Sequence, residues 1–190
     1  SLDLYSSFVW RGTTFGKGPH FQPEIEFTTN GLAIGIWGSV DFNGYSEADP
    51  YISFSFPFGL SLGMTDYYSP GLPFFNTSPL NGSHAFEINC SYMAGGFELG
   101  ANYILNEAGG AGSEGGDMYF QIGYAFKRFS LFAGAGNGWL TTDGNFNVCN
   151  LGLGTEEEIE VTDKFSFQLN GQIVFNPDSE NLFLTVGISF

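Results

Sequence analysis

The chain has 190 residues, a length that suits one compact domain over residues 1–190 better than two. Its net charge of −15, from 20 acidic and 5 basic residues, would repel a nucleic-acid backbone, so nucleic acid is excluded as a partner. Only 13% of the residues are charged, against an ordinary share of about 25%, which is low for a surface that faces water.

Helix-forming segments are scarce, and residues that fit pleated strands, such as Phe, Tyr, Ile, Val and Thr, are abundant. No run of ~18 apolar residues occurs, so a transmembrane helix is excluded. The chain does not open with a basic and then an apolar region. We therefore expect a signal peptide to have been removed close to Ser1.

Apolar and polar residues alternate along most of the chain, a period of two that is typical of strands with two different environments. The apolar residues take the odd positions of 21–27 and 165–175 and the even positions of 118–126 and 182–190. This pattern predicts about twelve strands, most of them near the ~9–11 residues that a tilted strand needs to cross a bilayer. In chain order they lie near residues 2–11, 20–29, 32–42, 49–57, 60–68, 84–93, 97–106, 117–126, 129–138, 146–161, 164–175 and 181–190.

The predicted connections alternate in length. Tight turns fall at 30–31, 58–59, 94–96, 127–128 and 162–163, and Asn30-Gly31 is a strong hairpin signal. Between them lie mostly longer loops, at 12–19, 43–48, 69–83, 107–116, 139–145 and 176–180. Short turns at one end and longer loops at the other are typical of a transmembrane barrel with periplasmic turns and extracellular loops.

The polar faces of the predicted strands carry mainly Gly, Ser, Thr, Asn and Gln, which suits a lumen better than an exterior in water. We therefore predict an all-β fold, a closed antiparallel transmembrane β-barrel of about twelve strands, with ten as the other even count. Its place would be the outer membrane of a Gram-negative bacterium, with outer-membrane lipid and other outer-membrane proteins as partners. A packed soluble core is the alternative for the aromatic residues. The predicted lipid-facing aromatics are Phe8, Trp10, Phe27, Phe42, Phe54, Phe56, Phe120, Phe126, Phe165, Phe167, Phe175 and Phe190.

Two short segments carry a resemblance. Residues 7–12 (Ser-Phe-Val-Trp-Arg-Gly) and 35–39 (Gly-Ile-Trp-Gly-Ser) resemble the opening and a strand of a family of mostly uncharacterised bacterial outer-membrane barrels. Phe190, at the end of an alternating strand, resembles the C-terminal signal by which such barrels are recognised for insertion. The resemblance covers about the first quarter of the chain and implies a fold and a location, without an activity.

The sequence contains no recognisable catalytic motif. His20 and His84 are the only histidines, and a barrel lipase or deacylase would need one of them paired with a serine. No cluster of Cys and His has the spacing of metal ligands, and we expect no metal or other cofactor. Cys90 and Cys149 fall on distant predicted strands, which favours two free thiols over a disulfide.

Acidic residues near the predicted loops could hold Ca²⁺, but no EF-hand spacing is present and a solvated acidic rim is favoured. These residues are Glu47, Asp49, Asp66, Glu107, Glu114, Asp117, Asp143, Asp178 and Glu180.

Other charges share the polar faces of their strands and are predicted to face the lumen. They are Arg11, Glu24, Glu26, Asp41, Glu87, Glu98, Glu156, Glu158 and Glu160. Isolated buried carboxylates are costly, so such a lumen must hold water or cations. The first functional hypothesis is a narrow channel with an acidic lumen for small solutes. The second is a non-conducting accessory barrel that docks to a larger outer-membrane complex. A lipid-modifying enzyme ranks last.

Overall fold

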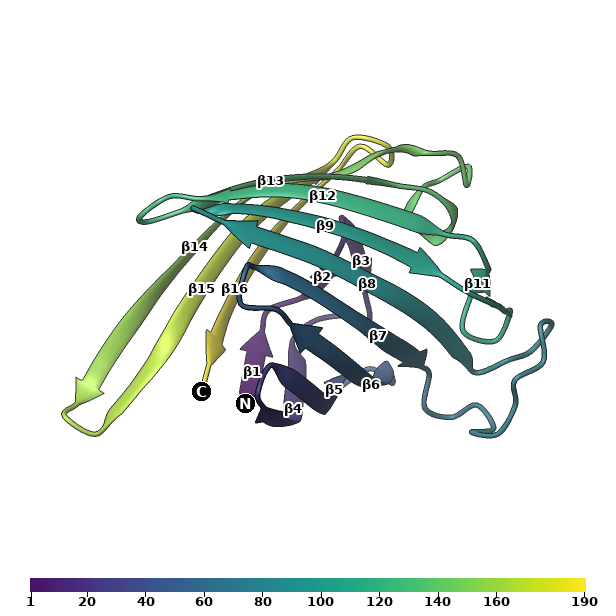
Figure 1. Ribbon diagram of the computed structural model, residues 1–190, viewed down its shortest axis with the longest axis horizontal. Coiled ribbons are helices and arrows are strands. Elements are labelled where there is room, and N and C mark those ends of the chain that lie inside the picture. The colour runs from purple at the N-terminus through teal and green to yellow at the C-terminus, as the bar shows by residue number, and fades with distance from the viewer.

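The computed structural model describes residues 1–190 and shows a closed antiparallel β-barrel (Figure 1). Twelve strands form the wall, which confirms the predicted fold class and strand count. In chain order they are β1 (Leu2–Tyr5), β4 (His20–Thr29), β5 (Leu32–Asp41), β6 (Ser46–Ser55), β7 (Leu60–Tyr68), β8 (His84–Ala94), β9 (Phe97–Ile104), β12 (Met118–Ala125), β13 (Ser130–Gly136), β14 (Asn147–Thr162), β15 (Phe165–Asn176) and β16 (Asn181–Ser189).

The barrel closes at its shortest strand. β1 pairs with β4, where Leu2 lies opposite Pro23, and with β16, where Asp3 lies opposite Ser189. The backbones of Leu2 and Phe190 exchange two hydrogen bonds of 3.0 and 3.3 Å, so the chain ends lie side by side (Figure 1). Both ends lie on the side of the barrel that carries the short turns.

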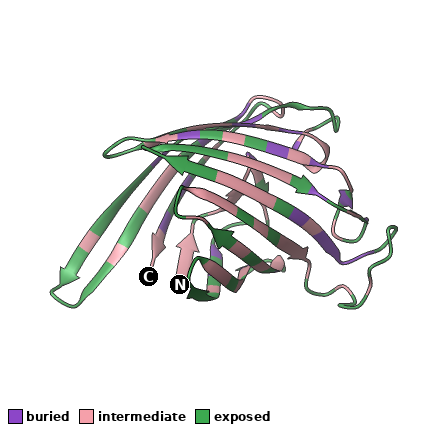
Figure 2. Cartoon of the chain, in the orientation of Figure 1, coloured by how far each residue is buried: buried purple, intermediate pink, exposed green.

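Large apolar side chains cover the outside of the wall. Ile25 is 77% exposed and Phe27 is 64% exposed, whereas the buried hydrophobic residues number only seven. Figure 2 shows exposed and less exposed residues alternating along the strands, and no second sheet covers the exposed ones. An apolar surface this extensive is stable against hydrocarbon and unstable in water, so the exterior is that of a transmembrane barrel.

The predicted first strand, residues 2–11, is wrong beyond Tyr5. The chain leaves the wall there and forms a separate hairpin of β2 (Phe8–Trp10) and β3 (Thr13–Phe15), seen inside the ring of strands in Figure 1. The reason is local: the two-residue turn at Arg11 and Gly12 has positive φ angles of 51° and 82°, the geometry that closes a tight hairpin. The predicted loop 12–19 therefore contains a short strand, β3.

Two of the longer loops contain structure of their own. β10 (Glu107–Ala108) pairs with β11 (Ser113–Glu114), and a short 3-10 helix, η1, covers Gly138–Leu140. No helix in the molecule is long and apolar enough to cross a bilayer.

Strands β14 and β15 extend beyond their neighbours. β13 pairs with β14 only as far as Gly154, and β16 pairs with β15 only from Gln168 onward. Residues 159–167 therefore form a two-stranded ribbon that projects past the short-turn end of the wall, at the lower left of Figure 1. We call this segment the ribbon.

Candidate functional site in the barrel lumen

The hairpin β2–β3 lies across the lumen and contacts opposite sides of the wall. The Trp10 ring lies 5.4 Å from the ring of Tyr67 on β7. On the other side, the Gly12 carbonyl accepts a hydrogen bond of 3.0 Å from the Asn176 side chain on β15. Because β7 and β15 are six places apart in the closed order of twelve strands, they face each other across the barrel. The hairpin therefore acts as a plug, and we use that name for residues 8–15.

Glycine is required at the tip of the plug. A Cβ atom at position 12 would clash with the backbone carbonyl of Cys149 on β14. The positive φ of Gly12 is also one that other residues rarely adopt. Because glycine meets both constraints, the turn can contact the wall directly.

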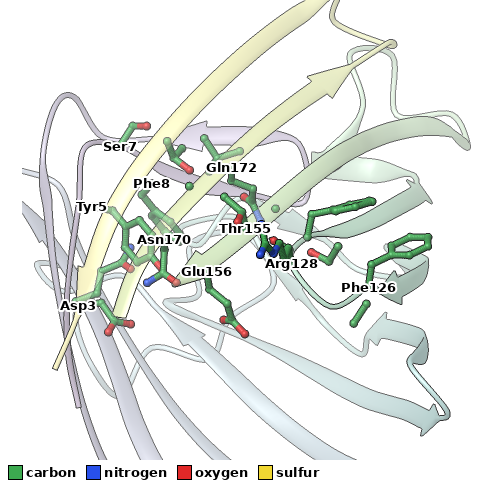
Figure 3. Close-up of a pocket in the computed structure, with 18 of the residues that line it drawn as sticks. Asp3, Tyr5, Ser7, Phe8, Phe126, Arg128, Thr155, Glu156, Asn170 and Gln172 are labelled. Atoms are coloured by element: carbon green, nitrogen blue, oxygen red, sulfur yellow. Dashed lines mark hydrogen bonds between the residues drawn. The ribbon is translucent and has the colours of Figure 1, made fainter. Parts of the chain in front are cut away.

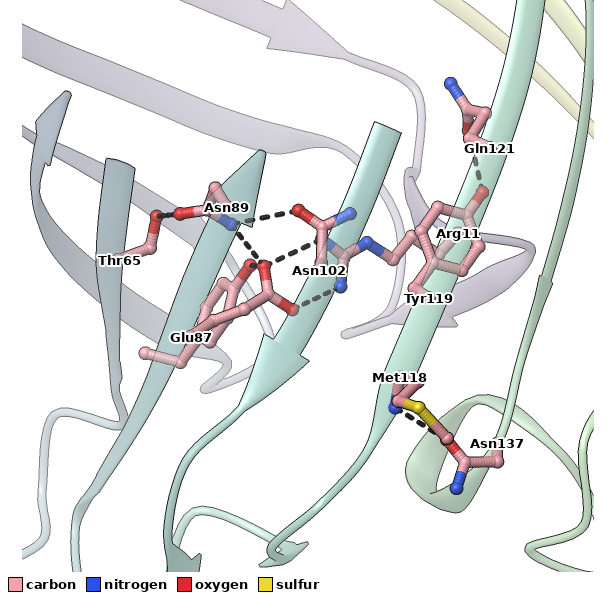
Figure 4. Close-up of polar contacts among 10 residues, drawn as sticks. Arg11, Thr65, Glu87, Asn89, Asn102, Met118, Tyr119, Gln121 and Asn137 are labelled. Carbon is pink, nitrogen blue, oxygen red and sulfur yellow. Dashed lines mark hydrogen bonds and ion pairs between the residues drawn. The ribbon is translucent and has the colours of Figure 1, made fainter. Parts of the chain in front are cut away.

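Arg11 anchors the plug through a buried ion pair. Its two terminal nitrogens donate to the two carboxylate oxygens of Glu87 on β8, at 2.5 and 2.8 Å (Figure 4). Glu87 is 1% exposed and also accepts hydrogen bonds from the Tyr67 hydroxyl, at 2.9 Å, and from the Asn89 amide, at 2.6 Å. The guanidinium group lies over the Tyr119 ring, 4.6 Å from its centroid. Such a bidentate pair fixes orientation as well as charge.

The two segments that carry the family resemblance meet inside the barrel. Phe8, from residues 7–12, lies 5.4 Å from the ring of Trp37, from residues 35–39. The plug and the wall strand that supports it are thus built from these two segments.

The plug separates the lumen into a short-turn side and a loop side. On the short-turn side lie two cavities of about 530 and 730 Å³; the first is lined by Tyr5, Glu156 and Gln172 (Figure 3), and the second by Glu98. On the loop side lies a smaller pocket of about 360 Å³. Phe8 lines both this pocket and the first cavity, so the plug is the wall between them.

The predicted lumen charges have different surroundings. Glu24 and Glu26 both lie within hydrogen-bond distance of the Tyr51 hydroxyl, at 2.6 and 2.8 Å. Asp41, at the loop end, accepts hydrogen bonds from three backbone N–H groups, those of Lys17, Asn43 and Tyr45. None of these three carboxylates forms an ion pair with a basic side chain.

The last two predicted lumen acids lie at or beyond the rim. Glu158 accepts a hydrogen bond of 2.7 Å from Ser166 and lines a shallow depression with Ser1. Glu160 lies on the ribbon, past the last residues that β13 and β16 pair, so its predicted place in the lumen is wrong. The reason is that acidic residues continue to occupy even positions of β14 beyond the point where the neighbouring strands of the wall end.

Phe8 and Trp10 were predicted to face lipid, and this is wrong because both belong to the plug and face the lumen. Phe56 and Phe167 are partly covered by neighbouring rings, Phe54 at 4.9 Å and Phe190 at 6.2 Å respectively. The others are exposed in the protein; they are Phe27, Phe42, Phe54, Phe120, Phe126, Phe165, Phe175 and Phe190.

Both histidines hold the fold together. His84 contacts an Asp66 oxygen through Nδ1 at 2.8 Å and the Phe74 carbonyl through Nε2 at 2.5 Å, which ties down the loop 69–83. His20 contacts the Ser39 hydroxyl at 2.9 Å, but each of these two residues is only 1% exposed. A histidine and a serine that no substrate reaches give the lipid-modifying hypothesis no support.

Cys90 and Cys149 are free thiols, as the strand positions predicted. No group of three or more His, Cys, Asp or Glu side chains is arranged to hold a metal ion.

Comparisons with known proteins match the chain to solved β-barrel structures but not to a protein family. No family model and no curated protein matches the chain. Among solved structures, a triple mutant of the Rhodopseudomonas blastica porin aligns with a TM-score of 0.45 at 12% identity, over 90% of this chain and 55% of the porin. Another triple mutant of that porin aligns with a TM-score of 0.44 over the same shares. The chain spans about half the length of these porins.

Proposed function

We propose that the protein is an outer-membrane channel with an acidic lumen that admits small cationic solutes and is closed by its plug in this conformation. The observation that supports it is the charge balance inside the barrel. Arg11 is the only basic residue among the strands and the plug that line the lumen, and Glu87 already neutralises it. Of the other four basic residues, Lys17 and Lys164 lie in a loop and a turn and line neither of the two short-turn cavities. Lys127 and Arg128, at the turn between β12 and β13, line the first cavity together with Glu156, so the negative charge without a basic neighbour in the lumen is that of Glu24, Glu26 and Glu98.

The remaining lumen carboxylates favour cations over anions. Glu24 and Glu26 lie on β4, Glu98 lines the second cavity and Glu156 lines the first. No basic side chain forms an ion pair with any of them. In a narrow water-filled space with low-dielectric walls, unpaired carboxylates lower the energy of a cation and raise that of an anion.

Reversal potentials in planar bilayers test this charge selectivity. We expect the purified protein to pass potassium in preference to chloride, and the triple variant Glu24→Gln, Glu26→Gln, Glu98→Gln to lose several-fold of that preference, since each change removes one charge at constant shape. Glu114→Gln, at the exposed residue of β11, is the matched control and should leave the preference unchanged. Anion selectivity in the unaltered protein would contradict the proposal.

The ribbon favours a second candidate function, that of an accessory barrel docked to another outer-membrane protein. Residues 155–162 of β14 have no partner strand on the β13 side, and such an edge is a template for a further strand. Ile159 lies directly opposite Phe167, so an Asn-Gly turn can replace residues 160–166. We expect this variant to lose any partner that co-purifies in mild detergent. Retention of the same partner by this variant would exclude the ribbon as the docking site.

A further inference from the structure

The loop-side pocket is walled by aromatic rings from the plug and from the barrel. Phe8 and Trp10 reach it from β2, Phe15 from β3, and Trp37 from β5. Trp139, from η1, also lines the pocket, and its ring lies 5.9 Å from that of Trp10. The protein has three tryptophans, and all of them line this pocket.

Two carboxylates line the same pocket. Glu47 and Asp49 are two residues apart on β6, so their side chains lie on the same face of the strand. Neither forms an ion pair, since the ion pairs of the protein are Arg11 with Glu87 and His84 with Asp66.

Asp49 is the stronger indication of a ligand. It is only 5% exposed, and its Oδ1 atom is buried without a hydrogen-bond partner from the protein. Glu47 accepts a hydrogen bond of 2.7 Å from the Tyr45 hydroxyl. Burial and the neighbouring Glu47 carboxylate raise the pKa of the Tyr45 phenol, which keeps it a donor. A buried carboxylate left without a partner is costly, and an incoming cation would offset that cost.

We infer that this pocket binds a compact organic cation, an alkylammonium or quaternary ammonium group, between the aromatic rings and the carboxylates of Glu47 and Asp49. Aromatic faces attract such cations, and more strongly when water is excluded. The volume of about 360 Å³ lies at the small end of the range for small-molecule sites. A neutral sugar could stack on the same rings, but it would leave both carboxylates without a counter-charge.

The inference rests on the proposed function, because it names the class of solute that would enter the lumen. Binding, however, can be measured on a barrel that passes no current. The two proposals can therefore fail separately.

Tryptophan fluorescence of the purified protein in detergent provides the test, because all three reporters line the site. Choline is the probe, and its uncharged isostere, with carbon in place of nitrogen, is the matched control ligand. We expect a saturable change with choline and binding of the isostere weaker by about tenfold or more.

Charge variants locate the binding to this pocket. Asp49→Asn and Glu47→Gln should each weaken choline binding by about tenfold, while Glu98→Gln, in the cavity on the other side of the plug, should leave it unchanged. If Asp49→Asn does not fold, the half-buried Glu47→Gln carries the test. Equal binding of choline and its isostere, no saturable change with choline, or unchanged binding in the folded charge variants would overturn the inference.

Discussion

Removal of the plug is expected to open the lumen and raise the single-channel conductance by about an order of magnitude, since the hairpin is the wall between the loop-side pocket and the short-turn cavities. Tyr5 on β1 lies directly opposite His20 on β4 in the antiparallel register, so an Asn-Gly turn can replace residues 6–19 without disturbing the wall. Conductance in planar bilayers measures the effect.

The ribbon variant provides the control, because it also shortens the chain but leaves the lumen closed. It should conduct like the unaltered protein. If deletion of the plug leaves conductance unchanged, then the plug does not close the channel. If the folded, plug-free barrel is silent as well, the channel proposal fails and the accessory role is favoured.

The second large effect concerns the stability of the folded barrel. Glu87→Ala should lower the free energy of unfolding by about 3–5 kcal/mol, because Arg11 would remain charged and buried without its partner. Urea unfolding of the refolded barrel in detergent, followed by tryptophan fluorescence, measures this loss.

The double variant Glu87→Leu, Arg11→Met distinguishes two contributions to the free energy of unfolding: the penalty of a buried charge without a partner, and the stabilisation by the ion pair itself. Replacement of both partners by apolar residues should cost less than Glu87→Ala alone. A loss in the double variant that equals or exceeds that of Glu87→Ala would show that the unpaired guanidinium is not the cause.

The wall of the barrel could be predicted from the sequence because lipid on one side and a polar lumen on the other impose a strict alternation on every strand. The long strands of the second half, such as β15 and β16, follow it over most of their length, with Val174 and Phe183 as the apolar exceptions on the polar face. The plug could not be predicted in this way. Phe8 and Trp10 continue the even-numbered apolar positions of Leu2 and Leu4, as a wall strand would, and alternation does not reveal what the apolar face touches.

The available signal for the plug was the Arg11-Gly12 pair followed by Thr13, Thr14 and Phe15, a tight turn between two short β-prone segments. The pocket was missed for a related reason. The alternation predicts a strand that begins at residue 49, which places Glu47 and Asp49 in an acidic rim, whereas β6 begins at Ser46. The ion pair of Arg11 with Glu87 joins residues 76 apart in the chain. Alternation within a strand predicts which face a residue is on, but it cannot predict which residue of another segment it will contact.

The position of the plug next to β1 also makes it part of the closure of the barrel. Only Ser6 and Ser7 separate β2 from β1, and β1 has four residues, three of which are in register with β16. A displacement of the hairpin would therefore act directly on the pairing of β1 with β16, the shortest strand pairing of the barrel. Entry of a bulky solute that moves the plug would strain the hydrogen bonds between β1 and β16. Among the wall strands, the backbone amides of this pair should therefore exchange their hydrogens fastest.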